Sequence, residues 1–277
     1  MHIRTRFVPL ALTLGAAIAC GDPSAPTAND RPLPDQPNAI TNGTPTGDAY
    51  GAVGNLFADL NGDGSWDYRC TGSLISETVF LTAGHCITEG AVYYITFAPV
   101  AFPAPTDLRT SDLISSTTGV RHPDYESSFI DLGVVILAAE DVAALGIEPL
   151  PLAPLGYLDA LRDEGAWGQR YSVVVGYGLS SYGQGRYVTR NDAVRRFAVI
   201  KMQQLGANFL FQLTNAVKAG RGGICYGDSG GPVLVDGLVV GVTSVTGRDL
   251  GCHSTAGFAR TDTETALAFL DDYVTLP

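Results

Sequence analysis

The sequence is poor in basic residues, with 17 lysines and arginines against 28 aspartates and glutamates, and its net charge is −11. An acidic surface repels phosphate backbones, so no nucleic-acid partner is expected. Beyond the N-terminus, no apolar run reaches the length needed to span a bilayer. Strong helical periodicity and internal repeats at solenoid periods are also lacking. These absences argue against a nucleic-acid-binding protein, a helical membrane protein and a solenoid.

The chain instead contains many short β-branched runs, such as YSVVVGYG (171–178) and LVVGVTSV (238–245). Gly, Pro, Asn and Asp separate these runs, and this pattern predicts a mostly β protein. Its 277 residues are enough for one or two domains with a full core.

Residues 1–20 have the layout of a signal peptide, because Arg4 and Arg6 precede an apolar run, Phe7 to Ile18, that is too short to span a membrane. The run ends in AAIAC, which resembles the lipobox of bacterial lipoproteins, where the cysteine (here Cys20) receives the lipid. The alternative is a plain signal peptide cleaved near Cys20. Either reading predicts export, as a cell-envelope lipoprotein or an extracellular protein.

Residues 21–39 contain five prolines and almost nothing apolar, so they predict a tether that builds no core. The cysteine count agrees with a lipidated Cys20, because five is an odd number and an exported protein normally pairs its cysteines. The other four can form two bridges. They are Cys70, Cys86, Cys225 and Cys252.

Three short stretches carry candidate chemistry. GICYGDSGGP (223–232) places Ser229 between glycines, which fits either a surface turn or a nucleophile with free amides around it. VFLTAGHC (79–86) is a strand pattern that ends in His85, either a buried structural histidine or a general base. A bridge from Cys86 to Cys70 would close a 16-residue interval and add about 3 kcal/mol.

SSFIDLGVVIL (127–137) places one acid, Asp131, at the head of an apolar strand. A buried carboxylate is costly unless it is paired, and pairing to a histidine would hold the imidazole in one tautomer. Asp124, in the Pro-containing turn RHPDY, is the competing acid. The order His85, Asp131, Ser229 then supplies a base, an orienting carboxylate and a nucleophile.

Seven motifs in order resemble the chymotrypsin/trypsin-like serine peptidase family. The resemblance implies an all-β fold of two six-stranded antiparallel β-barrels with a C-terminal helix. The first barrel is expected at 40–150 and the second at 151–277, with the active site between them. The motifs are CTGSLI (70–75), LTAGHC (81–86), DLGVVIL (131–137), VVGYG (174–178), GDSGGPV (227–233), GVTS (241–244) and the C-terminal helix.

That helix is also expected from its own residues, because Thr261 and Glu264 form a capping-box pattern. An apolar stripe follows at helical spacing. Its members are Ala266, Leu267, Leu270, Tyr273 and Val274.

The resemblance also assigns roles. The amides of Gly227 and Ser229 would form the oxyanion hole, and Ser244 would support Asp131. Cys225–Cys252 would be the bridge beside the specificity pocket. In the family, cleavage frees the α-amino group of a residue that here is Ile40, and this amine would pair with Asp228.

In the family that the chain resembles, the residue six before the nucleophile forms the pocket floor, and here that residue is Gly223, which carries no charge, while Ile224 beside it is apolar. Val245 and Thr246 stand on the pocket wall, where a threonine narrows the pocket, although a longer loop would let Gly247 take that position. Ala256 and Gly257 leave the opposite wall open. We therefore expect cleavage after uncharged, small to medium apolar residues.

DLNGDGSWD (59–67) spaces its oxygen ligands like the start of a calcium loop, with Gly64 at the turn position. Cys70 stands where the bidentate glutamate belongs, and a Gly-Asp-Gly hairpin needs no metal, so both readings stay open. The ligands would be Asp59, Asn61, Asp63 and Asp67.

The sequence thus predicts a serine endopeptidase that needs no cofactor and acts on polypeptides as a monomer. Contact with a membrane is expected only through a lipid on Cys20. The competing hypothesis is a catalytically inactive homologue that serves as a cell-surface binding or adhesion lipoprotein.

Overall fold

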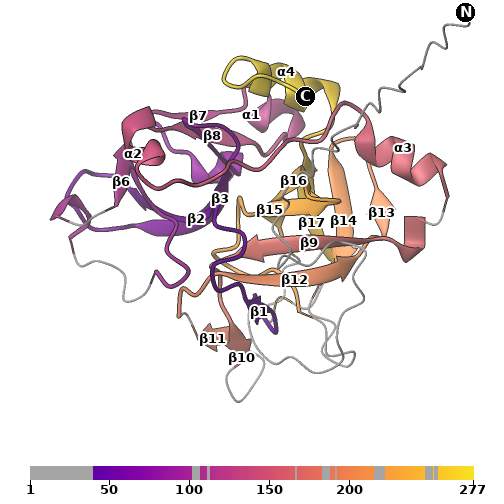
Figure 1. Cartoon of the computed structure of the whole chain (residues 1–277), viewed down its shortest axis with the longest axis horizontal. Coiled ribbons are helices and arrows are strands. Elements are labelled where there is room, and N and C mark those ends of the chain that lie inside the picture. Colours follow the sequence, from indigo (N-terminus) through magenta and orange to yellow (C-terminus); the bar gives the residue numbers. More distant parts are fainter. Residues whose placement is uncertain are drawn as a thin grey trace, which may run out of the picture.

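The computed structural model describes residues 40–101, 107–110, 113–165, 167–182, 188–190, 192–214, 222–246, 252 and 255–277. Their strands form two curled, barrel-like antiparallel sheets that sit beside one another (Figure 1). The predicted signal peptide, Cys20 and the tether at 21–39 lie outside the described residues.

The first sheet has seven strands in the order β6-β5-β2-β3-β4-β8-β7. They are β2 (Val53–Asp59), β3 (Tyr68–Leu74), β4 (Val79–Thr82), β5 (Val92–Thr96), β6 (Ile114–Ser116), β7 (Gly119–Arg121) and β8 (Gly133–Ile136).

The second sheet has eight strands in the order β1-β12-β9-β15-β16-β17-β14-β13, and β10 (Ser181–Tyr182) pairs separately with β11 (Val188–Arg190). The eight are β1 (Thr44–Pro45), β9 (Tyr171–Gly176), β12 (Arg196–Lys201), β13 (Gln204–Leu205), β14 (Phe209–Leu213), β15 (Pro232–Val235), β16 (Leu238–Val245) and β17 (Thr255–Arg260).

Two strands are buried on both faces and contribute side chains to two hydrophobic cores each. In β9, Val173 and Val175 enter the cluster between the sheets, whereas Val174 points into the core of the second sheet. In β8, Val134 and Val135 divide in the same way between the shared cluster and the core of the first sheet. Because side chains alternate along a strand, an unbroken valine run serves two cores at once.

The helices are short and lie outside the sheets. They are α1 (Tyr125–Ser128), α2 (Ala139–Ala143), α3 (Tyr157–Asp163) and α4 (Glu264–Asp271), with 3-10 turns η1 (Gly84–Cys86), η2 (Leu108–Thr110) and η3 (Trp167–Gln169). Among the residues described, no helix is long and apolar enough to cross a membrane.

The expected C-terminal helix is present as α4, but its cap differs from the prediction. Thr263, and not Thr261, is the N-cap residue, and its hydroxyl accepts a hydrogen bond from the Ala266 amide. The Thr261 side chain is fully buried and donates to the Val239 carbonyl oxygen instead. A hydroxyl already committed to a neighbouring strand cannot cap a helix.

The all-β, two-sheet prediction with a C-terminal helix is confirmed, and the strand counts are seven and eight instead of six and six. Residues 44–45 also depart from the expected first barrel, because Thr44 pairs with Phe197 of β12 in the second sheet. The N-terminal described segment therefore crosses to the second sheet before the chain enters the first.

Candidate active site

His85 lies in the 3-10 turn η1, directly after the buried strand β4. A Cβ on the preceding Gly84 would come 2.9 Å from the Leu132 carbonyl oxygen and 3.2 Å from Asp131 Oδ1. The absence of a side chain at Gly84 therefore lets His85 approach the start of β8 closely.

Asp131 stands just before β8 and is fully buried. Its Oδ2 accepts hydrogen bonds from His85 Nδ1 at 2.8 Å and from the Ser244 hydroxyl, and its Oδ1 accepts the His85 amide at 2.8 Å. Burial by itself would raise the pKa of Asp131. The His85 and Ser244 contacts outweigh burial and hold that pKa below its ordinary value.

Asp124 does not take this role. It precedes α1, where its carboxylate accepts a hydrogen bond from the Ser127 hydroxyl at 3.4 Å, and its amide donates to His122 Nδ1. The imidazole of His85 therefore faces Asp131 through Nδ1, and its Nε2 is turned away from the acid. The His85 side chain is 34% exposed, so solvent reaches it.

Both expected disulfide bonds are present, Cys70–Cys86 and Cys225–Cys252. The first joins β3 to the residue after His85 and brings Cys86 Sγ to 3.9 Å from the Ser229 carbonyl oxygen. Ser229 is half-buried, and within the described part of the chain its hydroxyl has no hydrogen-bond partner. The sequence-predicted serine and histidine thus lie on adjoining segments from different sheets.

The glycines after Ser229 are required by close packing, against the first sheet at Gly230 and against β9 at Gly231. A Cβ on Gly230 would lie 2.0 Å from Thr82 Oγ1 and 2.2 Å from the Thr71 carbonyl oxygen, and Gly230 has a φ of +82°. A Cβ on Gly231 would lie 2.4 Å from the Val175 carbonyl oxygen. Packing therefore excludes side chains at Gly230 and Gly231, independently of any need for free backbone amides.

Asp228, next to Ser229, is fully buried and accepts hydrogen bonds from the Gly178 amide at 2.7 Å and the Cys225 amide at 2.8 Å. Burial raises the pKa of Asp228 to about 7, although the two amides and the positive charge of Arg69 oppose the rise. At neutral pH this site therefore favours an additional positive partner.

The segment that begins at Ile40 packs against the core of the second sheet and pairs with Gly223. The Ile40 side chain is buried, and its φ of +24° is a costly conformation for a β-branched residue. The Gly223 amide donates to the Thr41 carbonyl oxygen at 3.0 Å, and the Thr41 hydroxyl donates to the Leu179 carbonyl oxygen.

The candidate pocket residues come from two places, the segment at Gly223 that pairs with Thr41 and the end of the β16–β17 pairing. Gly223 and Ile224 are buried, and Val245 lies opposite Gly257 in the strand register. A Cβ on Gly257 would come 2.8 Å from Val245 Cγ2, so the Val245 side chain already occupies the space beside this glycine. Thr246 is half-buried, and Gly247 lies outside the described residues.

An aromatic row beside this wall was not expected from the sequence. Phe129, which is 44% exposed, stacks on Phe209 with ring centroids 5.7 Å apart, and Phe209 stacks on Phe211 at 5.8 Å. Both β14 rings would lie 3.2 Å from a Cβ on Gly257. Eighty positions separate Phe129 from Phe209, so only the tertiary fold brings these rings together.

In the 59–67 loop, the carboxylate oxygens accept hydrogen bonds from backbone amides. Asp59 accepts from Gly62 at 2.7 Å and Gly64 at 2.8 Å, and Asp63 accepts from Ser65 at 2.8 Å. Within the described ranges, one group of potential metal ligands converges, and it consists of Cys70, His85 and Cys86. Its two cysteines form a disulfide bond with each other.

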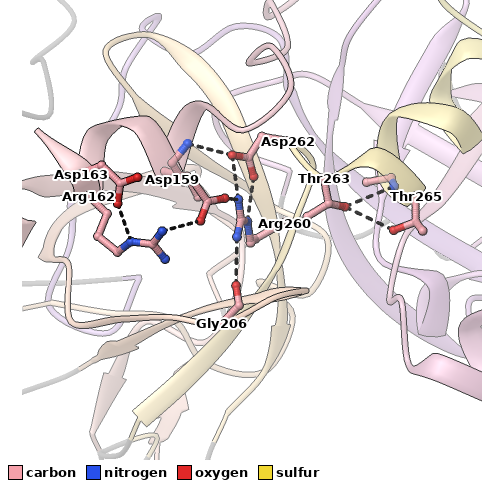
Figure 2. A network of polar contacts seen from close by, with 10 residues as sticks. Asp159, Arg162, Asp163, Gly206, Arg260, Asp262, Thr263 and Thr265 are labelled. Carbon is pink, nitrogen blue, oxygen red and sulfur yellow. Dashed lines mark hydrogen bonds and ion pairs between the residues drawn. The ribbon is translucent and has the colours of Figure 1, made fainter.

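A separate polar network joins α3, β17 and the start of α4 (Figure 2). Arg260, 4% exposed as a side chain, donates to Asp262, Asp159 and the Gly206 carbonyl oxygen. Burial would lower the pKa of Arg260, but these carboxylates raise it. A cavity of about 380 Å³ opens beside the network, and none of its lining residues belongs to the candidate active site.

A family model described as Trypsin matches residues 51–266, and the chain belongs to this family. Serine protease 1 of Drosophila melanogaster is 30% identical over 81% of this chain and 82% of its own length. Brachyurin of Leptuca pugilator is 29% identical over 75% and 86%. Chymotrypsin of Phaedon cochleariae is 29% identical over 66% of this chain and 64% of its own length.

Solved structures agree on the fold. HL collagenase superposes with a TM-score of 0.62 at 19% identity, over 85% of this chain and 100% of that chain. The scabies mite inactivated protease paralogue S-I1 superposes with a TM-score of 0.54 at 14% identity, over 80% and 93%. Because an inactivated protease shares the fold, the fold alone does not decide whether this chain is catalytic.

Proposed function

We propose that the chain is an active serine endopeptidase that cleaves polypeptides through His85, Asp131 and Ser229. The observation that carries the proposal is the buried Asp131 carboxylate, which accepts hydrogen bonds from His85 Nδ1 and from Ser244. This contact leaves His85 Nε2 as the atom able to accept a proton. An inactivated paralogue has no need to preserve this arrangement.

In the proposed reaction, Ser229 Oγ attacks the scissile carbonyl carbon while His85 Nε2 takes the hydroxyl proton. The negative oxygen that forms faces the amides of Gly227 and Ser229. His85 then gives its proton to the leaving amine, and an acyl-enzyme remains on Ser229. Water, activated by the same imidazole, hydrolyses the ester and restores the serine. No cofactor takes part.

The alternative is a catalytically inactive homologue that acts as a cell-surface binding or adhesion lipoprotein. All three proposed catalytic residues are present, and the paired Asp131 argues for the enzyme. We therefore rank the inactive homologue second.

We further propose that the enzyme cleaves after uncharged, small to medium apolar residues. The uncharged Gly223 and buried Ile224 support this preference, because neither residue offers a carboxylate to pair with a lysine or arginine side chain of the substrate. A peptide-library digest by the processed protein should be dominated by apolar residues before the cut. A profile dominated by Lys or Arg would overturn the assignment of the pocket.

Activation by cleavage between Ala39 and Ile40 belongs to the same proposal. The new α-ammonium group would pair with Asp228, whose pKa burial otherwise raises to about 7. Cleavage would also remove the peptide bond before Ile40, so the chain would no longer hold Ile40 at a positive φ. A buried carboxylate without its partner costs about 3–5 kcal/mol. Because Ala39 is small and apolar, the enzyme itself is a candidate for this cut.

Cleavage at Ile40 would also release the domain from a lipid on Cys20, because Cys20 is the only cysteine before that bond. The two disulfides fit export to an oxidising compartment. Activation and release would then be one event. The released domain is expected to be monomeric.

We expect the uncut chain to have a kcat/KM lower than the processed chain by a factor on the order of 100 or more. Wild type and Ser229→Ala would be expressed in a lipoprotein-processing host, fractionated, and sequenced from the N-terminus. Wild type should be soluble and begin at Ile40, whereas the variant should stay membrane-held. Full activity in a precursor that retains residues 21–39 would refute activation by cleavage, and release of the variant at Ile40 would indicate a separate protease.

A further inference from the structure

Thr71 lies in β3 of the first sheet, fully buried against residues 227–231 of the second. Its hydroxyl donates to the Gly227 carbonyl oxygen at 2.8 Å and accepts the Tyr177 amide at 3.2 Å. Its own amide donates to the Ser229 carbonyl oxygen at 2.7 Å. One residue therefore holds the carbonyl groups of both residues whose amides are assigned to the oxyanion hole.

Thr71 is itself held in place. Its carbonyl oxygen accepts the Thr82 hydroxyl at 2.8 Å, and Thr82 ends the strand that leads into His85. The hydroxyl contact to Gly227 thus connects the segment that carries the proposed base to the segment that carries the proposed nucleophile.

Gly227 needs this support more than another residue would. It has a φ of +93° and no Cβ, so its backbone has little intrinsic preference among conformations. The direction of its N–H depends on how the residue is held by neighbours. The hydrogen bond from the Thr71 hydroxyl restrains Gly227 from the carbonyl side while leaving its amide unused.

We propose that Thr71 is a positioning residue of the oxyanion hole, acting through its hydroxyl on Gly227. The inference rests on the proposed peptidase function. An oxyanion hole is effective because its donors are aimed before the charge develops, and loss of one donor typically costs 100- to 1,000-fold in kcat. An enzyme whose Gly227 amide is present but poorly oriented should therefore lose part of this 100- to 1,000-fold contribution to kcat.

The test compares Thr71→Val, Thr71→Ala and Thr71→Ser in the processed protein. Valine and alanine remove the hydroxyl and leave Gly227 without its donor, whereas serine keeps it. The matched control is Thr243→Val. Thr243 is buried, and within the described residues its hydroxyl has no partner, yet its backbone bonds Gly230 and Gly231.

We expect Thr71→Val and Thr71→Ala to lower kcat by about 10-fold or more with little change in KM, because the Gly227 amide stabilises the transition state and not the bound substrate. Affinity for a peptide aldehyde, which forms a tetrahedral adduct, should fall by a similar factor. Thr71→Ser and Thr243→Val should stay within about threefold of wild type. A merely structural role would lower the melting temperature without this split between kcat and KM.

The serine–alanine pair differs only in the hydroxyl, so it decides the question even where valine does not fold. Equal kcat and equal aldehyde affinity for Thr71→Ser and Thr71→Ala, with active wild type, would overturn the inference and leave the proposed function intact. Processed wild type without activity would overturn the proposed function, and this inference with it.

Discussion

Replacing Ser229 with alanine should lower kcat by a factor on the order of a million, because the reaction then has no nucleophile. The fold should survive, since the Ser229 hydroxyl makes no hydrogen bond within the described residues. The backbone contacts of this position, including the Thr71 amide to the Ser229 carbonyl oxygen, are unaffected by the substitution. Steady-state hydrolysis of one peptide substrate and a thermal melt measure both effects.

The matched control is Ser65→Ala, a change of an exposed serine in the 59–67 loop, which should keep full activity. Both variants must be compared as chains beginning at Ile40, so that a failure of processing is not mistaken for a failure of catalysis. Substantial turnover by a Ser229→Ala protein of native stability would remove Ser229 from the mechanism.

Replacing Asp131 with asparagine should lower kcat near neutral pH by a factor of about 10⁴. The two carboxylate oxygens now accept from His85 Nδ1, the His85 amide and the Ser244 hydroxyl, and an amide offers only one accepting atom. An Asn NH₂ group facing Nδ1 would favour the tautomer with its proton on Nε2, which cannot accept the Ser229 proton. The pH dependence of kcat for the variant measures this loss.

Asp124→Asn is the control for Asp131→Asn, because Asp124 is the competing acid in the turn before the strand. It makes a 3.4 Å contact to Ser127 and none to His85, so its loss should change kcat by less than about threefold. A large loss for Asp124→Asn with a small one for Asp131→Asn would reverse the assignment of the acid.

The pairing of Asp131 also predicts a pH effect on stability. The pKa of Asp131 is lower in the folded chain than its ordinary value, so the unfolded chain binds this proton more tightly. The stabilisation is therefore present above the unfolded pKa of about 4 and is lost as the pH falls through the folded pKa.

The sequence was sufficient for features that depend on local pattern. Short β-branched runs predicted a mostly β protein, the family resemblance implied its two sheets, and the His85–Asp131 pair and both disulfides join residues that the motifs singled out. These residues could be chosen because each stands at a strand end or in a glycine-rich turn, where its neighbours limit its roles.

Features that depend on contacts between distant strands could not be predicted. Thr261 and Thr263 look equivalent as helix caps, and the choice is made by the Val239 carbonyl oxygen of another strand. Thr71 looks like one more β-branched strand residue until β3 is placed against Gly227. The stacking of Phe129 on Phe209 likewise arises only when the two sheets meet.

The most direct test of the central claim, that Ser229 is an activated nucleophile, is to label the processed protein with a fluorophosphonate and map the adduct by mass spectrometry. The reagent reacts with a serine whose proton a neighbouring base removes. The account predicts one adduct, on Ser229, that disappears in Ser229→Ala and is strongly reduced in Asp131→Asn. No adduct on a chain correctly processed to Ile40, or an adduct on another serine, would contradict it.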